Sequence, residues 1–165
     1  MREMKVILHD LDRSYDGMIE AKCDRMIAAD GKYAPCQGCF GCWTRHPAEC
    51  SMKDKLQQAC RVIGQAKELV IVTRNLYGEY SAAVKNVLDR AIGSSTPFST
   101  YRGRQMHHTL RYGKHELWKV VVYGEITEAE QATFRYRAER NAINDGYSRS
   151  EVIFIRDLSE LEGIL

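Results

Sequence analysis

The feature that most constrains the fold is a series of short, apolar runs that alternate with segments of helical pattern. The clearest run, residues 69–73 (LVIVT), is β-branched and apolar on both faces, which is typical of a parallel strand covered on both sides. Other strands are expected at residues 6–8, 25–29, 117–123 and 152–155, and helices at 14–21, 53–65, 81–92 and 127–144. This order predicts one α/β domain, residues 1–165, with a five-stranded parallel sheet, helices on both faces, and strands 6–8 and 69–73 at its centre.

One long polar segment, residues 94–116, interrupts this alternation. It exceeds the usual length of a connection, and it carries the apolar residues Phe98, Tyr101, Met106 and Leu110. We expect a loop that contributes to a dimer contact. The alternative is that its arginines and its paired histidines, His107 and His108, reach an anion site in a neighbouring subunit.

Composition narrows the class of protein. The formal net charge is only +2, with the charges of both signs dispersed, so we expect no nucleic-acid partner. No apolar run approaches the length of a membrane span, and the first ten residues lack the apolar core of a signal peptide. The sequence therefore predicts a cytoplasmic protein that does not bind membranes.

The loop after the 69–73 strand is the first candidate site. It leaves the carboxyl end of the sheet, where parallel sheets bind ligands, and it enters the amino terminus of a helix. Tyr77 can stack on a flat ring, and Gly78 lets the backbone approach that ring. The alternative is a surface loop whose tyrosine packs on its own helix.

The second candidate site is a cysteine-rich loop. The residues Cys36, Cys39, Cys42 and Cys50 follow the spacing C-x2-C-x2-C-x7-C. Such spacing can place thiolates around an iron–sulfur cluster or around tetrahedral zinc, with His46 as a spare ligand. These cysteines can also simply pack as small apolar side chains. We assign Cys60 to the core and assign no role to Cys23.

These two loops carry a family resemblance. The runs PCQGCFGCWTRHPAECSMKDKLQQ (35–58) and ELVIVTRNLYGEYSAAVKNVLDR (68–90) resemble the flavodoxin-like NADPH-dependent FMN reductase family, and the cysteine spacing resembles its iron–sulfur flavoprotein branch. The resemblance implies a flavodoxin-like three-layer sandwich with strand order 2-1-3-4-5. It also implies FMN at the carboxyl edge of the sheet, a homodimer or homotetramer, and a nicotinamide or protein electron donor.

Carried over by position, the isoalloxazine-binding loop of the family falls on Arg74, Asn75, Leu76, Tyr77, Gly78, Glu79 and Ser81. The cluster ligands of the branch, for a [4Fe–4S] cluster or alternatively zinc, fall on Cys36, Cys39, Cys42 and Cys50. Lys85, Asp89 and Arg90 match the helix of the same block and are expected to hold structure.

The chain departs from the family in the phosphate loop. Where the family has a loop rich in Ser, Arg, Asn and Thr, this chain reads His9-Asp10-Leu11-Asp12-Arg13-Ser14. Two carboxylates would repel a phosphate dianion, and only Arg13, Ser14 and the helix amino terminus could attract it. FMN is then bound weakly, held by its phosphate in another way, or lost.

Two functions follow from these patterns. The first is an FMN-dependent oxidoreductase or electron-transfer protein of the NAD(P)H-dependent FMN reductase type. The second is a flavodoxin-like module that has lost FMN and uses a structural zinc or a thiol loop to bind a partner.

Overall fold

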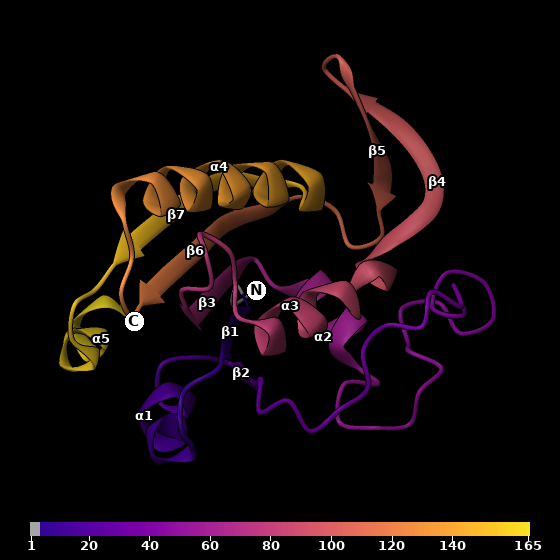
Figure 1. The fold of residues 1–165 in the computed structure, drawn as a ribbon. Coiled ribbons are helices and arrows are strands. Elements are labelled where there is room, and N and C mark those ends of the chain that lie inside the picture. Colours follow the sequence, from indigo (N-terminus) through magenta and orange to yellow (C-terminus); the bar gives the residue numbers. More distant parts are fainter. Residues whose placement is uncertain (1–3) are drawn as a thin grey trace.

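The centre of the molecule is a five-stranded parallel sheet (Figure 1). The computed structural model describes residues 4–165. The strands lie in the order β2-β1-β3-β6-β7 and every neighbouring pair is parallel. Their bounds are β1 Lys5–His9, β2 Arg25–Ala28, β3 Glu68–Arg74, β6 His115–Tyr123 and β7 Tyr147–Phe154. The prediction of a five-stranded parallel α/β sheet with β3 at its centre is confirmed, and the arrangement is consistent with a flavodoxin-like fold.

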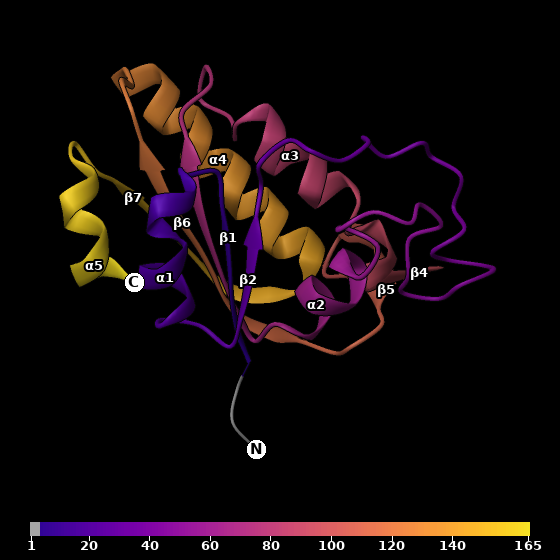
Figure 2. The ribbon, with the colours of Figure 1, turned by 90° about the horizontal axis from the view of Figure 1, so that it is seen from below.

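Helices cover both faces of this sheet (Figure 2). One face carries α2 (Ala59–Gln65), α3 (Ala82–Asp89) and α4 (Glu128–Asp145), whereas the other carries the short α1 (Asp16–Glu20) and α5 (Leu161–Ile164). Successive strand residues point to opposite faces. Accordingly Leu8 and Ile71 join the core beneath α2 to α4, and Ile7 and Val70 join the core beneath α1 and α5.

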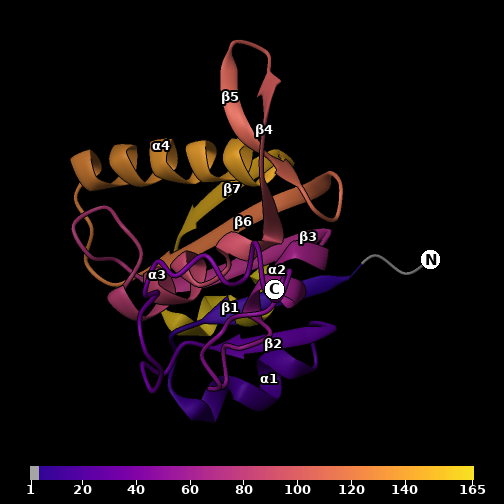
Figure 3. The same cartoon turned by 90° about the vertical axis from the view of Figure 1, so that its right-hand side faces the viewer.

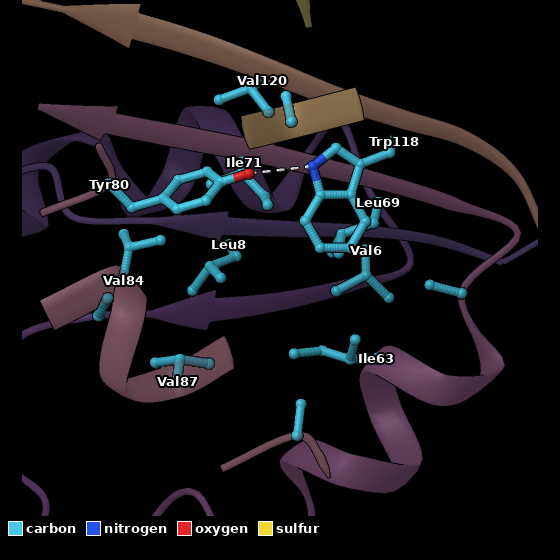
Figure 4. Close-up of a cluster of buried hydrophobic side chains, with 14 of the residues drawn as sticks. Val6, Leu8, Ile63, Leu69, Ile71, Tyr80, Val84, Val87, Trp118 and Val120 are labelled. Carbon is cyan, nitrogen blue, oxygen red and sulfur yellow. Dashed lines mark hydrogen bonds between the residues drawn. The ribbon is translucent and has the colours of Figure 1, made fainter. Parts of the chain in front are cut away.

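A buried polar link joins β6 to the residue that follows the β3–α3 loop in the larger core (Figure 4). Trp118 Nε1, on β6, donates to the Tyr80 hydroxyl at 3.2 Å, and Asn141 Nδ2, on α4, donates to the same hydroxyl at 3.3 Å. Tyr80 follows the β3–α3 loop and is 1% exposed. The loop that leaves the centre of the sheet is thereby anchored in the core, because a buried polar group is stable only when it is paired.

Local signals explain the helix boundaries. Ser81 caps α3, as expected, with its Oγ accepting from Val84 N at 3.3 Å. Thr127 and Glu130 form a reciprocal capping box at the start of α4, and Gly146, with φ 77°, ends that helix. The helix predicted at residues 14–21 begins instead with a 3₁₀ turn, Arg13–Tyr15, which is capped by Asp12 and not by Ser14.

The helix predicted at residues 53–65 forms only over its second half, α2. The Asp54 carboxylate accepts from Leu56 N at 3.0 Å and pairs with the buried guanidinium of Arg90. Arg90 also donates to Ala34 O at 3.2 Å. Residues 53–58 therefore form turns that bind the cysteine-rich loop to the end of α3. The helix predicted at residues 81–92 was also too long, because α3 ends at Asp89.

Residues 94–116 contain a β-hairpin, so the prediction that this segment is a loop is wrong. β4 (Ser95–Arg102) and β5 (Gln105–Leu110) pair antiparallel and extend away from the body of the molecule (Figure 3). The turn uses Gly103 at φ 62°. Arg102, the residue directly before this turn, ties the hairpin to the end of α4 by donating to Ile143 O at 2.7 Å and to Asn144 O at 2.8 Å. Because these two strands intervene in the chain, the sheet order is 2-1-3-6-7 in whole-chain numbering instead of 2-1-3-4-5.

Within the described part of the chain, no helix is both long enough and apolar enough to cross a membrane.

Candidate functional site: a cleft at the carboxyl edge of the sheet

The β3–α3 loop ends in a two-residue turn with an exposed tyrosine. Leu76 N donates to Glu79 O at 3.0 Å and Glu79 N donates back to Leu76 O at 3.1 Å. Between them Tyr77 and Gly78 have φ values of 55° and 80°, the left-handed pair of a type I′ turn. Tyr77 is 86% exposed, so its ring projects from a turn that a tyrosine adopts only at a cost.

The tip of this loop is fixed against the start of α4. Asn75 Nδ2 donates to Glu125 O at 2.8 Å and Asn75 Oδ1 accepts from Gly78 N at 2.9 Å. A Cβ at Gly78 would lie 3.0 Å from Glu130 O, so a larger residue would push the loop off the helix. The backbone beneath Tyr77 is therefore held from both sides.

The loop's own backbone amides are largely occupied. The N–H groups of Gly78, Glu79, Tyr80 and Ser81 donate to Asn75 Oδ1, Leu76 O, Glu79 Oε1 and Thr73 Oγ1, respectively. Amides at a helix amino terminus are suited to a carbonyl-rich or anionic ligand, but here these four N–H groups hold the turn. The features left to meet a ligand are the ring of Tyr77 and the half-exposed side chain of Leu76.

An open cleft of about 770 Å³ lies between this loop and the β6–α4 loop. Five of the predicted isoalloxazine-binding residues line it, together with Ala82, three residues of the β6–α4 connection and one residue of the first turn of α4. The lining comprises Arg74, Asn75, Leu76, Tyr77, Ser81, Ala82, Glu125, Ile126, Thr127 and Glu130. Gly78 and Glu79 do not line it: Gly78 packs on α4, and Glu79 pairs with Arg137 Nε at 2.7 Å.

The sequence indicated the second wall of this cleft only by position. The β6–α4 loop follows β6, which is a parallel neighbour of β3. The carboxyl ends of these two strands therefore lie side by side, and so do the loops that follow them. No residue type in Glu125-Ile126-Thr127 signals a ligand, and Glu130 reads as a helix cap, which it also is.

The first acid of the β1–α1 loop, Asp10, ties three strands together at this edge. Its carboxylate accepts from Thr73 Oγ1 at 3.1 Å, from Arg74 N at 3.0 Å and from the Tyr123 hydroxyl at 3.0 Å. Burial, followed by the charge of Asp10, raises the pKa of Tyr123, so this phenol remains a donor at neutral pH. Asp10 is thus a structural acceptor at the ends of β1, β3 and β6.

The second acid of that loop, Asp12, occupies the place where a phosphate would need donors. Its carboxylate accepts from Ser14 N at 2.9 Å, and this backbone hydrogen bond lowers the pKa of Asp12. Arg13 and Ser14 are exposed, but the Ser14 amide already binds a carboxylate. The β1–α1 loop therefore offers a phosphate two carboxylates and an occupied Ser14 amide, whereas the Tyr77 cleft offers a planar ligand an exposed aromatic ring.

The predicted metal ligands are not gathered. Cys36 and Cys39 are exposed, Cys50 is half-buried, and Cys42 is buried in a small cluster with Cys60. Among residues 4–165, no group of three or more His, Cys, Asp or Glu side chains is placed to hold a metal ion. The spacing alone did not reveal that Cys42 packs with Cys60 on α2, outside the loop.

No protein-family model matches the chain, and no curated protein matches its sequence. Its fold does have solved counterparts. An FMN-dependent NADH-azoreductase from Bacillus anthracis str. Ames Ancestor, solved in complex with FMN, superposes with a TM-score of 0.59 at 10% identity, covering 98% of this chain and 93% of that one. The chain shares the fold of this reductase.

Two further structures show the same likeness. An NAD(P)H:quinone oxidoreductase from Methanothermobacter marburgensis has a TM-score of 0.53 at 12% identity and covers 99% of this chain and 93% of its own. An NADPH-quinone reductase from P. pentosaceus has a TM-score of 0.50 at 13% identity, with 93% and 85% covered. At such identities the likeness establishes the fold, and the site must be argued from this chain's own residues.

Proposed function

We propose that this chain is a flavin-dependent NAD(P)H oxidoreductase that binds the flavin ring in the Tyr77 cleft. The observation that carries the proposal is Tyr77 itself: an aromatic side chain, 86% exposed, held on a braced type I′ turn beside a cleft at the carboxyl edge of a parallel sheet. The shared fold of reductases described as FMN- or NAD(P)H-dependent supports it.

Each wall of the cleft has a role in this proposal. Tyr77 offers an aromatic face to a planar ring, and Leu76 extends that apolar surface. Asn75 and Gly78 fix the turn, so the ring of Tyr77 meets the ligand from a preset position. When bound, FMN would supply the hydride or single-electron chemistry, while the chain binds and orients the ring.

The phosphate contributes little to binding in this proposal. Asp12 occupies the Ser14 amide and adds a negative charge of its own. Among the cleft residues the cationic side chain is Arg74, at the edge. We therefore expect affinity to come mainly from the ring and to be lower than in a protein with a complete phosphate loop.

Electron partners and assembly belong to the same proposal. We expect a nicotinamide or a reduced protein as donor, and a homodimer or homotetramer as the working state. A metal cluster is not included, because no three of the loop cysteines are placed to hold a metal ion among residues 4–165.

Fluorescence titration of the purified protein with FMN tests this proposal. Tyr77→Ala removes the stacking face and should weaken FMN binding about tenfold. Tyr136→Ala is the matched control, since Tyr136 is 65% exposed on α4 and does not line the cleft; it should leave the affinity unchanged. Equal affinities in all three proteins would place the flavin elsewhere, and no binding by any of them would favour a module without flavin.

A further inference from the structure

Two cysteines from different parts of the chain lie side by side in a small buried cluster. Cys42 belongs to the turn at residues 41–45 and is 8% exposed; Cys60 lies near the start of α2 and is fully buried. Ala48 completes the cluster, and Trp43 and Tyr112 pack against it. Both thiols are free.

Gly93 makes this approach possible. A Cβ at Gly93 would lie 2.8 Å from Cys42 Cβ and 2.8 Å from Cys60 Sγ, closer than real side chains approach. Both cysteines therefore fill the space that the missing side chain leaves, and any larger residue at position 93 would force them apart.

Each cysteine of the pair has a polar neighbour. Cys60 Sγ donates to Arg90 O at 3.0 Å, and Arg111, whose Nε donates to Gly93 O at 3.1 Å, lies near Cys42. Cys42 Cβ and Cys60 Sγ approach the same point above Gly93, which places the two sulfurs within reach of each other. The thiolate is the reactive form of a cysteine, and a neighbouring thiol can then attack the oxidised sulfur.

We propose that Cys42 and Cys60 are an oxidisable dithiol that a hydroperoxide converts into a disulfide. The Cys42 thiolate attacks one peroxide oxygen, the O–O bond breaks, and Cys42 becomes a sulfenic acid while hydroxide leaves. Hydroxide takes up the proton that Cys42 released and becomes water. Cys60 then attacks Cys42 Sγ, the S–O bond breaks, and hydroxide leaves with the Cys60 proton as a second water. Two thiols have lost two electrons, and one hydrogen peroxide has gained them.

Accessibility assigns the order of these steps. Cys42 retains some exposure and Cys60 has none, so a small peroxide meets Cys42 first. The exposed Cys39 has a different neighbour, the Ser51 hydroxyl at 3.8 Å. The disulfide would bind the irregular cysteine-rich segment covalently to α2. This inference does not depend on flavin binding.

Peptide mapping after oxidation tests the proposal. The double variant Cys36→Ser/Cys39→Ser leaves Cys42 as the one cysteine in the tryptic peptide 33–45, while Cys60 is alone in 56–61 and Cys50 is alone in 46–53. Treatment with hydrogen peroxide, alkylation in denaturant and mass spectrometry should yield peptide 33–45 linked to 56–61. Dithiothreitol should restore two alkylatable thiols.

The control variant Cys60→Ser should form no linked peptide and should leave Cys42 as a sulfenic acid that dimedone traps. Linkage of 33–45 to 46–53 in the double variant would overturn the pairing of Cys42 with Cys60. Full alkylation of Cys42 and Cys60 after excess peroxide would overturn the reactivity of the pair.

Discussion

Tyr77 combines high exposure with a backbone conformation that is unfavourable for a residue with a Cβ. It has the highest exposure among the large apolar and aromatic side chains of residues 4–165, and its φ of 55° lies in the left-handed region. The left-handed conformation costs a residue with a Cβ about 1 kcal/mol or more of conformational free energy, whereas glycine adopts it without this cost. Because the side chain is 86% exposed, little of its surface is covered within the described part of the chain, which is why we assign the ring to a ligand.

Tyr77→Gly separates the two properties. Removing the Cβ should raise the free energy of unfolding by about 1 kcal/mol, because the turn keeps its conformation without strain. The same change should weaken FMN binding about tenfold, because the stacking face is lost. Chemical denaturation and flavin titration on the same preparation check both effects. A stabilised variant with unchanged flavin affinity would remove Tyr77 from the site.

At the scale of elements, the end of β1 and the start of α1 enclose a histidine. His9 is fully buried at the last position of β1, and its Nε2 lies 3.5 Å from Asp16 Oδ1 on α1. Burial lowers the pKa of His9, and the charges of Asp16 and Asp10 offset this only in part. The folded state therefore holds His9 neutral at a pH where the unfolded chain would already bind a proton.

The sign of the resulting pH dependence follows. Because the pKa of His9 is lower in the folded state, the unfolded state binds more protons below about pH 6.5, and folding loses stability as the pH falls from there. His115, also buried with a lowered pKa, acts in the same direction. Asp145, whose pKa burial raises to about 7, acts in the opposite direction.

His9→Phe isolates the contribution of His9. In urea unfolding between pH 7.5 and pH 5, the free energy of unfolding should fall less steeply for the variant than for the unaltered protein. His115 and Asp145 are present in both proteins and cancel in the comparison. Identical slopes would show that His9 does not titrate differently on folding.

The strands and the first wall of the site were predictable because their signals are local. A run such as residues 69–73 has no exposed face, so it must be central and parallel. The hairpin was missed because β4 and β5 are mostly polar and exposed; their pairing depends on Gly103 and on the anchoring of Arg102 to α4, which no periodicity reveals.

The remaining errors at the site come from long-range contacts. Asp54 was read as part of a helix and instead pairs with Arg90, and Cys42 was grouped with Cys39 but lies against Cys60. Likewise, the sequence showed that Asp12 brings a negative charge to the expected phosphate loop, but not that its carboxylate accepts a hydrogen bond from the Ser14 amide. The spacing of residues in the sequence shows which side chains are close along the chain. It does not show which distant residue a side chain contacts in the folded protein.

At the scale of the whole molecule, the hairpin is the largest feature outside the α/β core (Figure 3). Tyr101 and Met106 pair across it on one face and are 74% and 65% exposed, and Phe98 is 73% exposed. Apolar side chains on a projecting two-stranded arm favour a partner surface, since an isolated hairpin has little stability of its own. We expect that surface to be a second copy of the chain.

Light scattering at micromolar concentration tests the assembly. The unaltered protein should have at least the mass of a dimer, and Tyr101→Ser/Met106→Ser should shift it toward the monomer. Tyr136→Ser, an exposed aromatic change on α4, is the control and should leave the mass unchanged. A monomer before any substitution would contradict the role of the hairpin.

We propose that this chain holds a flavin by its ring in the Tyr77 cleft and not by its phosphate at the β1–α1 loop. Parallel titrations with FMN and riboflavin, with the unaltered protein and with Asp12→Ser, distinguish the two modes of binding. The dissociation constants of the two flavins should lie within about threefold of one another in the unaltered protein. In Asp12→Ser, FMN should bind about fivefold more tightly, because a charge is removed and the Ser14 amide is less strongly held, while riboflavin is unaffected. If FMN bound about a hundredfold more tightly than riboflavin to the unaltered protein, the phosphate would be a main contact; if neither flavin bound, the Tyr77 cleft would not be a flavin site.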